Sequence, residues 1–125
     1  MQPTAEQFTE KAWAAVVAAQ QLAQSARHQQ LESEHLLLAL LQQNGLAGRI
    51  LNKAGVDTNG FETSVQAYLQ RQPSMNSQPE SVFLGRGVNG VLDRAESQRN
   101  SFGDSYISIE HLLLALSEED RCGRQ

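Results

Sequence analysis

A seven-residue run occurs twice in this 125-residue chain, and it constrains the fold more than any other feature. The run EHLLLAL stands at residues 34–40 and returns unchanged at residues 110–116, a shift of 76 positions. The same shift aligns apolar residues in the segments before each run, for example Val16 with Leu92. Repeated units of this size bury their apolar faces against one another. The sequence therefore predicts a pseudo-twofold pair of helical units.

The composition favours an all-α fold for these units. Leu, Ala and Gln supply 45 of the 125 residues and are good helix formers, while β-branched and aromatic residues never alternate along a run. Capping residues and apolar spacing predict helices over about 4–26, 32–43, 46–54, 57–71, 86–101 and 108–118. The register of the repeat further predicts that residues 8–44 superpose on residues 84–120.

The chain has the length of a single domain, residues 1–125, with two parts. The first repeat is expected over about 4–71. A linker over about 72–81 holds two of the three prolines and no periodic pattern. The second repeat, from about 82–125, stops before counterparts of the last two helices of the first. This suggests a trimmed fragment of a longer protein, in which the helix over 112–116 is partly exposed.

The charge of the chain argues against several classes of partner. Ten Lys and Arg residues stand against 14 Asp and Glu residues, which gives a net charge of −4 and no basic surface for nucleic acid. No window approaches the roughly 18 to 20 apolar residues of a membrane helix, and the N-terminus lacks the pattern of a signal peptide. We therefore expect a cytoplasmic chain without nucleic-acid or membrane partners. Its one cysteine, Cys122, cannot form an internal disulfide.

A glycine pattern at residues 85–90 needs a separate explanation. The segment GRGVNG fits G-x-G-x-x-G, and an acidic residue, Asp104, follows 19 positions after Gly85. Dinucleotide binding requires a preceding strand within a βαβ unit, whereas here a short segment leads into another helix. We interpret the pattern as a loop that enters a helix. Because no G-x-x-x-x-G-K-[ST] motif occurs, the chain is expected to hold no cofactor and to hydrolyse no ATP.

The duplicated pairs Glu34-His35 and Glu110-His111 suggest a metal or acid–base site at first sight. Adjacent helical residues point about 100° apart, however, and no second histidine follows at i+4 to complete a ligand set. A carboxylate in the first turn of a helix is favoured by the helix dipole, which is a structural role. His28 stands alone in a polar loop and is expected to be exposed. The sequence therefore predicts no catalytic residue and no metal ligand.

The duplicated EHLLLAL run resembles the N-terminal domain of the Clp family of AAA+ unfoldases, which is built from two such repeats. Residues 9–23 are similar to the opening helix of that domain. The segments at 83–86, 93–96 and 103–111 look most like the ClpB branch of protein disaggregases. The resemblance covers almost the whole chain. It implies a compact bundle of two Clp repeats, the second truncated, without ATPase activity of its own.

The resemblance also implies a role and a set of partners. The chain would be a noncatalytic substrate-binding accessory domain of a hexameric, ATP-driven chaperone that works with a DnaK-type partner. ATP and Mg would be held in AAA+ motor modules elsewhere in the parent protein. The substrates would be unfolded or aggregated polypeptides, taken for disaggregation. The alternative is the adaptor-docking N-domain of a protease-coupled Clp ATPase, whose partner is a folded adaptor.

By matching positions, the resemblance implies that Thr9, Asp104 and Glu110 bind substrate. For Glu110 and Asp104 the sequence also allows a purely structural role. Glu110 can satisfy the free backbone N–H groups at the start of its helix. Asp104 can form the turn that follows Gly103.

Overall fold

The regular elements of the described part of the chain are six α-helices, one turn of 3-10 helix and two very short strands. The computed structural model describes residues 3–43, 45–77, 79 and 82–118. The elements in order are the 3-10 helix η1 (Ala5–Gln7), α1 (Glu10–Ser25), β1 (Gln30–Leu31), α2 (Ser33–Gln42), α3 (Leu46–Lys53), α4 (Thr58–Gln70), β2 (Phe83–Leu84), α5 (Arg86–Phe102) and α6 (Ile109–Ser117). The all-α prediction is confirmed, with a minimal two-stranded pairing added. Among these elements, no helix is both long and apolar enough to cross a membrane. The predicted end of the second repeat and Cys122 lie outside the described residues.

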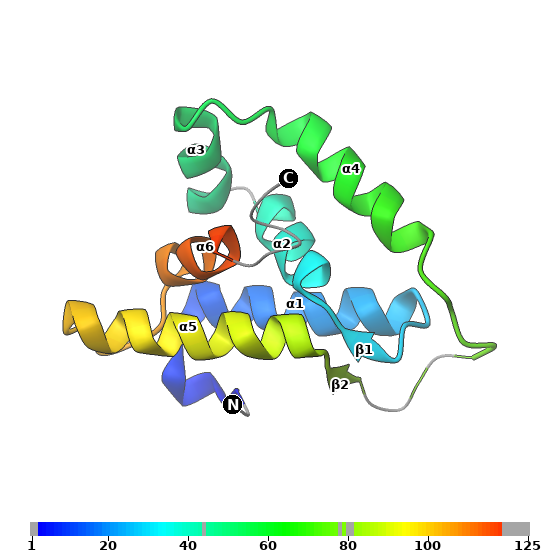
Figure 1. Ribbon diagram of the computed structural model, residues 1–125, viewed down its shortest axis with the longest axis horizontal. Helices are drawn as coiled ribbons and strands as arrows, with labels where there is room; N and C mark the ends of the chain where they lie inside the picture. The colour runs from blue at the N-terminus through cyan, green and yellow to red at the C-terminus, as the bar shows by residue number, and fades with distance from the viewer. Residues whose placement is uncertain (1–2, 44, 78, 80–81, 119–125) are drawn as a thin grey trace.

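The predicted repeat is visible in the bounds of the helices. A shift of 76 residues carries α1 onto residues 86–101, where α5 lies, and α2 onto residues 109–118, where α6 lies. In each repeat a short motif helix packs on a longer one, α2 on α1 and α6 on α5 (Figure 1). Of the two motif helices, α2 is followed by the further helices α3 and α4, whereas no further helix is described after α6. Helix α4 packs along α2. The motif helix of the first repeat therefore has a cover that α6 lacks within the described residues.

Extended residues of each repeat pair with extended residues of the other. Leu31, before α2, pairs in parallel with Leu84, before α5. Ile107 is the counterpart of Leu31, and it forms a parallel bridge with Phe8, the counterpart of Leu84. Backbone hydrogen bonds of 2.8 and 2.9 Å follow both pairings, each donated by the residue after Leu84 or Phe8. The pseudo-twofold relation therefore extends to the backbone contacts between the repeats.

The prediction of one helix over residues 4–26 is wrong at its start. The capping box at Thr4 belongs to η1, a single turn that stops at Gln7. Phe8 then takes an extended conformation, and α1 begins only at Glu10. The reason is the bridge between Phe8 and Ile107, because an extended residue paired with a distant segment cannot also continue a helix. Local capping identifies the turn, while a tertiary pairing ends it.

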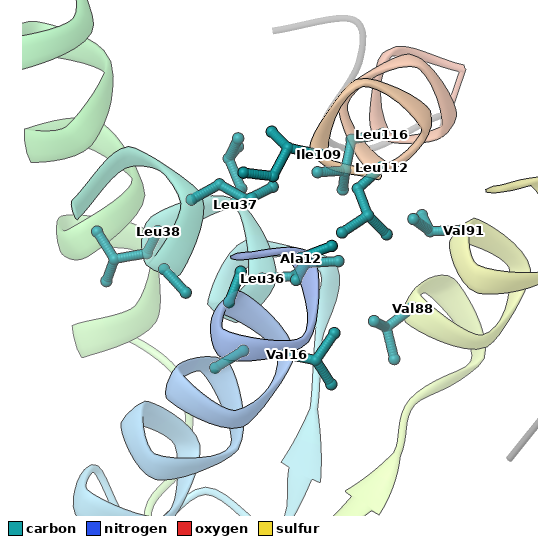
Figure 2. Packing of buried hydrophobic residues seen from close by; sticks show 14 of the residues in the cluster. Ala12, Val16, Leu36, Leu37, Leu38, Val88, Val91, Ile109, Leu112 and Leu116 are labelled. Atoms are coloured by element: carbon teal, nitrogen blue, oxygen red, sulfur yellow. The ribbon is translucent and has the colours of Figure 1, made fainter. Parts of the chain in front are cut away.

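Apolar side chains from both repeats meet in one core. Figure 2 shows Ala12 and Val16 of α1 between the leucines of α2 and the valines of α5. The α1 face in this core is mostly alanine, with Ala12, Ala15, Ala19 and Ala23 fully buried. Small side chains at a helix contact allow a short distance between the helix axes. The alanine stripe therefore lets α2 pack closely on α1.

Gly85 lies where no side chain fits. A Cβ atom at this position would lie 2.6 Å from Oε1 of Glu32 and 2.9 Å from the backbone carbonyl oxygen of Leu31. The carbonyl oxygen accepts the Gly85 N–H in the pairing between repeats, so it cannot move without disturbing that contact. At Gly90, inside α5, a Cβ atom would meet nothing closer than 3.9 Å. Packing between the repeats thus accounts for the first glycine of the G-x-G-x-x-G pattern.

These two glycines should respond in opposite directions to the same substitution. Gly85→Ala should lower the free energy of unfolding by about 1 to 3 kcal/mol, because the added methyl group overpacks the contact with Leu31. Gly90→Ala should raise it by about 0.5 to 1 kcal/mol, because alanine favours a helix interior. Urea denaturation followed by Trp13 fluorescence measures both values. Changes of the same sign would contradict this account of Gly85.

Candidate functional site

Each motif helix begins with a histidine that makes the same hydrogen bond. Nδ1 of His35 accepts from the backbone N–H of Glu32 at 2.9 Å, and Nδ1 of His111 accepts from the backbone N–H of Ser108 at 2.9 Å. A neutral imidazole that accepts at Nδ1 carries its hydrogen on Nε2. The start of the helix therefore fixes the tautomer of both histidines and leaves each Nε2–H to donate elsewhere.

The two histidines donate to different partners at matching positions. Nε2 of His35 lies 2.9 Å from Nδ1 of His28, and Nε2 of His111 lies 2.9 Å from Oδ2 of Asp104. Positions 28 and 104 are related by the 76-residue shift, so the first repeat has an imidazole where the second has a carboxylate. The prediction that His28 is alone and exposed is wrong. It is 6% exposed, because its ring turns inward to accept from His35.

His35 stays neutral in this environment. Burial and, second, the positive charge that His28 can carry lower the pKa of His35 from 6.5 to about 4. Burial acts in this direction because a charged imidazole loses the water that stabilises it. At pH 7 His35 is therefore a hydrogen-bond donor within the fold.

The two glutamates of the repeated run lie in different environments. Glu34 is 4% exposed at the start of α2, whereas Glu110 is exposed at the start of α6. The run EHLLLAL that starts at each glutamate is identical and gives no sign of this difference. Within the part of the chain that the structure describes, no group of three His, Cys, Asp or Glu side chains could hold a metal ion.

Asp104 has structural partners that the sequence does not reveal. Its carboxylate accepts from His111, and its backbone carbonyl oxygen accepts from Nη1 of Arg99 at 3.0 Å. The ring of Phe102 stacks on that of His111, with centroids 5.9 Å apart. The side chain of Asp104 is still 53% exposed. Asp104 thus anchors the start of α6 and keeps part of its carboxylate open to solvent.

Thr9 and Glu110 lie beside the same hollow. Oγ1 of Thr9 accepts from the backbone N–H of Ala12 at 3.2 Å and so caps α1. The Thr9 N–H donates to the carbonyl oxygen of Ile107, which fixes Thr9 beside the start of α6. Both Thr9 and Glu110 line a pocket of about 460 Å³ between α1, α3 and α6. The structure therefore brings two of the three predicted residues together, while Asp104 is not among the residues that line this pocket.

This pocket continues into a second hollow of about 430 Å³, and we call the two together the α1–α3–α6 groove. The groove is lined by residues 9–11 and 14 around α1, by residues 43, 45, 46 and 49 around α3, and by residues 108–110 at α6. Leu46 and Ile109 give it apolar walls, and charged side chains of both signs surround them. Sequence reasoning missed Leu46 and Arg49, because no local pattern indicates that α3 packs beside α6.

Comparison with known proteins identifies the family of the chain. The family of the Clp repeat (R) N-terminal domain matches residues 7–124. The chain is 74% identical over 125 residues to chaperone protein ClpB 1 of Parasynechococcus marenigrum, which covers 100% of this chain and 14% of that protein. It is 51% identical to chaperone protein ClpB 2 of Nostoc sp., covering 99% of this chain and 14% of that protein. The chain thus spans about 14% of the length of these curated relatives.

Solved structures agree with this assignment. The N-terminal domain of Hsp104 from Candida albicans matches with a TM-score of 0.87 and 28% identity, over 95% of this chain and 79% of that chain. The N-terminal domain of the ClpV1 ATPase from E. coli matches with a TM-score of 0.79 and 27% identity, over 90% and 68% of the two chains. The chain therefore belongs to the Clp repeat N-terminal domain family, as the duplicated EHLLLAL run indicates.

Proposed function

We propose that this chain is the noncatalytic substrate-binding domain of a ClpB-type chaperone and engages unfolded or aggregated polypeptides for disaggregation. The likeness to ClpB chaperones along the whole chain supports the class of parent protein. The observation that carries the proposal is the α1–α3–α6 groove, which offers an open surface lined by apolar and charged side chains.

The chemistry of the groove suits an unfolded polypeptide. Such a chain presents apolar side chains and backbone N–H groups that are not yet paired. Leu46 and Ile109 offer apolar contact, while the exposed carboxylate of Glu110 offers a charged acceptor for N–H donors. None of these contacts requires a particular sequence. The groove is also open to solvent along its length, which favours release.

The three predicted residues take different parts in this proposal. Glu110 is the direct acceptor, and Thr9 sets the edge of the groove by capping α1. Asp104 does not line the groove; it holds His111 at the start of α6 and offers the exposed part of its carboxylate. Asp104 can serve both as a turn residue and in the proposed substrate role, because its anchored carboxylate is still half exposed.

The remaining roles belong to the parent protein. We infer that its AAA+ modules form a hexamer, bind ATP and Mg, and act with a DnaK-type chaperone in the cytoplasm. This chain would then require no cofactor of its own. It would deliver substrate to those modules.

Glu110→Ala should weaken the binding of labelled, permanently unfolded casein about 3- to 10-fold, which corresponds to about 1 kcal/mol. Fluorescence anisotropy measures this binding. Thermal stability should change little, because a carboxylate at a helix start contributes only about 0.3 to 1 kcal/mol. Asp104→Ala should lower stability by about 1 kcal/mol, because His111 loses its acceptor. Asp104→Asn keeps an acceptor without the charge and so separates the anchoring role from the binding role.

Glu6→Ala is the matched control, because Glu6 is an exposed glutamate in η1 outside the groove. It should leave casein binding unchanged. If binding follows thermal stability across all the variants, or survives the double change of Asp104 and Glu110 to alanine, the proposed site is wrong. Binding of a folded adaptor without affinity for casein would instead favour the N-domain of a protease-coupled Clp ATPase.

A further inference from the structure

Two adjoining hollows of the first repeat lie between the end of α1, α2 and α4. They measure about 380 and 440 Å³ and share His28, His35 and Ser74 in their walls. The larger hollow has an apolar side formed by leucines of three helices, Leu22, Leu38 and Leu69. We call the two hollows together the α1–α4 cleft. It shares no lining residue with the α1–α3–α6 groove.

The start of α2 fixes which nitrogen of His28 carries a hydrogen. Neutral His35 accepts at Nδ1 from the N–H of Glu32, so it donates through Nε2 to Nδ1 of His28. The hydrogen of neutral His28 must then lie on Nε2. Among the described residues, no group accepts from this Nε2–H, although His28 is 6% exposed and lines both hollows. The α1–α4 cleft therefore contains a buried donor that a ligand can satisfy.

The charge of the cleft favours an acceptor without net charge. Apart from the histidines, Glu32 is the one charged residue among the described residues that line it. A second carboxylate or a phosphate placed here would be repelled by Glu32. A backbone carbonyl oxygen carries no net charge and accepts from an imidazole N–H. The donor of His28 and the charge of Glu32 thus point to a peptide carbonyl.

The polar walls of the cleft also match a peptide backbone. They are rich in glutamine, with Gln29, Gln30, Gln66, Gln70 and Gln72. Each side-chain amide both donates and accepts, as each peptide unit does. Such walls can pair with an extended backbone in more than one register.

The segment after α4 completes the cleft and is fastened in place. It passes the C-terminal end of α1 (Figure 1) and contributes residues 72–75 to the walls. The backbone N–H of Met75 donates to the carbonyl oxygen of Arg27 at 2.8 Å, and Oγ of Ser74 donates to that of Ala26 at 3.1 Å. Binding sites for small ligands are largely preformed in this way.

The second repeat has a different surface at the matching positions. There Asp104 replaces His28, so His111 donates to an acceptor of the chain itself. Phe102 stands at the position of Ala26, and its ring stacks on His111. The combination of a free donor and an apolar hollow beside the motif histidine therefore belongs to the first repeat.

We propose that the α1–α4 cleft is a second polypeptide-binding site, which takes an uncharged, extended segment with one apolar side chain. The apolar side chain packs on Leu22, Leu38 and Leu69, and a neighbouring backbone carbonyl oxygen accepts from Nε2 of His28. The site is separate from the groove of the proposed function, and its ligand need not be a disaggregation substrate.

A short capped peptide tests the site directly. The probe is acetyl-Gly-Gly-Leu-Gly-Gly-amide, titrated into the 15N-labelled 125-residue chain at pH 8 and followed by NMR. The amides of Leu22, His28 and Leu69 should shift and saturate, with a dissociation constant on the order of 1 mM. The amides of Leu46 and Glu110, in the groove, should not shift. A peptide with aspartate in place of leucine, and N-acetylleucine with its free carboxylate, should both bind more weakly.

Variants that borrow residues from the second repeat separate the two parts of the site. His28→Asp keeps an acceptor for His35, as Asp104 does for His111, but removes the donor and should weaken binding about 10-fold or more. Leu22→Gln introduces the residue found at position 98 and should weaken binding about 3- to 10-fold. It tests the site even if His28→Asp does not fold. Val17→Gln is the matched control, because Val17 is half-buried on α1 and lines neither hollow.

Binding that is lost as expected in the first two variants and kept in Val17→Gln would support the proposal. It is overturned if no saturable shift occurs in the cleft up to about 10 mM peptide. Unchanged affinity in Leu22→Gln or in folded His28→Asp overturns it as well. Tighter binding of N-acetylleucine than of the capped peptide would make the cleft an anion site and overturn the assigned ligand. Failure of casein binding at the groove leaves all these outcomes unaffected, because they are read at amides of the cleft.

Discussion

Replacing Leu38 with alanine should lower the free energy of unfolding by about 2 to 4 kcal/mol, as is typical of buried leucines. Leu38 is 5% exposed and lies on the side of α2 that faces α4 (Figure 2). Leu69 of α4 shares a hollow with it. Truncation removes apolar contact and leaves a cavity that packed helices close only in part. Urea denaturation followed by Trp13 fluorescence measures the loss.

Leu114 is the matched control, because it is the same residue in the second copy of the run. It is 42% exposed, since no described helix covers α6 as α4 covers α2. Leu114→Ala should therefore cost about 1 kcal/mol or less, close to the range of surface substitutions. Equal losses at the two positions would show that the described asymmetry between the repeats is wrong.

Ala19→Leu should be the second large effect, with an expected loss of about 2 to 3 kcal/mol. Ala19 is fully buried in the stripe where α2 packs closely on α1. A leucine needs space that this contact does not have, so it would push the two helices apart or take a strained rotamer. The same denaturation measurement gives the loss, and a change in near-ultraviolet circular dichroism would report the altered packing around Trp13.

Ala14→Leu makes the same substitution on the same helix at an exposed position. It should change the free energy of unfolding by no more than about 0.5 kcal/mol. A loss at Ala14 as large as that at Ala19 would mean that leucine disturbs α1 itself. Tolerance at both positions would mean that the alanine stripe does not set the distance between α1 and α2.

The repeated run, together with capping residues and apolar spacing, predicted most of the fold. Its 76-residue shift predicts that α5 and α6 correspond to α1 and α2, and both correspondences hold. Apolar spacing and capping residues place most helix ends within about two residues of those described. These are local properties: a helix of this kind is encoded by the residues within it and at its ends.

What the sequence did not reveal depends on residues far apart in the chain. The start of α1 was misplaced because Phe8 pairs with Ile107. His28 was taken as exposed because its partner, His35, lies beyond a loop and a short strand. The repeat itself held a usable signal for Asp104: position 104 matches position 28, and each lies seven residues before a motif histidine.

The candidate site was predictable only in part. Matching to the family selected Thr9 and Glu110, and the structure places both beside one groove. The apolar wall and the cation that α3 contributes, Leu46 and Arg49, follow from the packing of α3 beside α6. That packing joins the two repeats, and neither repeat contains a local pattern that requires it.

The pairing of extended residues between the two repeats has a consequence for synthesis of the chain on the ribosome. Phe8 is synthesised before its partner Ile107, which follows 99 positions later. At about 5 to 20 residues per second, this wait lasts on the order of 5 to 20 seconds. Until then α1 lacks the contact that fixes its start, and contacts between such distant residues also slow folding. The nascent domain is thus itself an incompletely folded polypeptide until its last motif helix has been made.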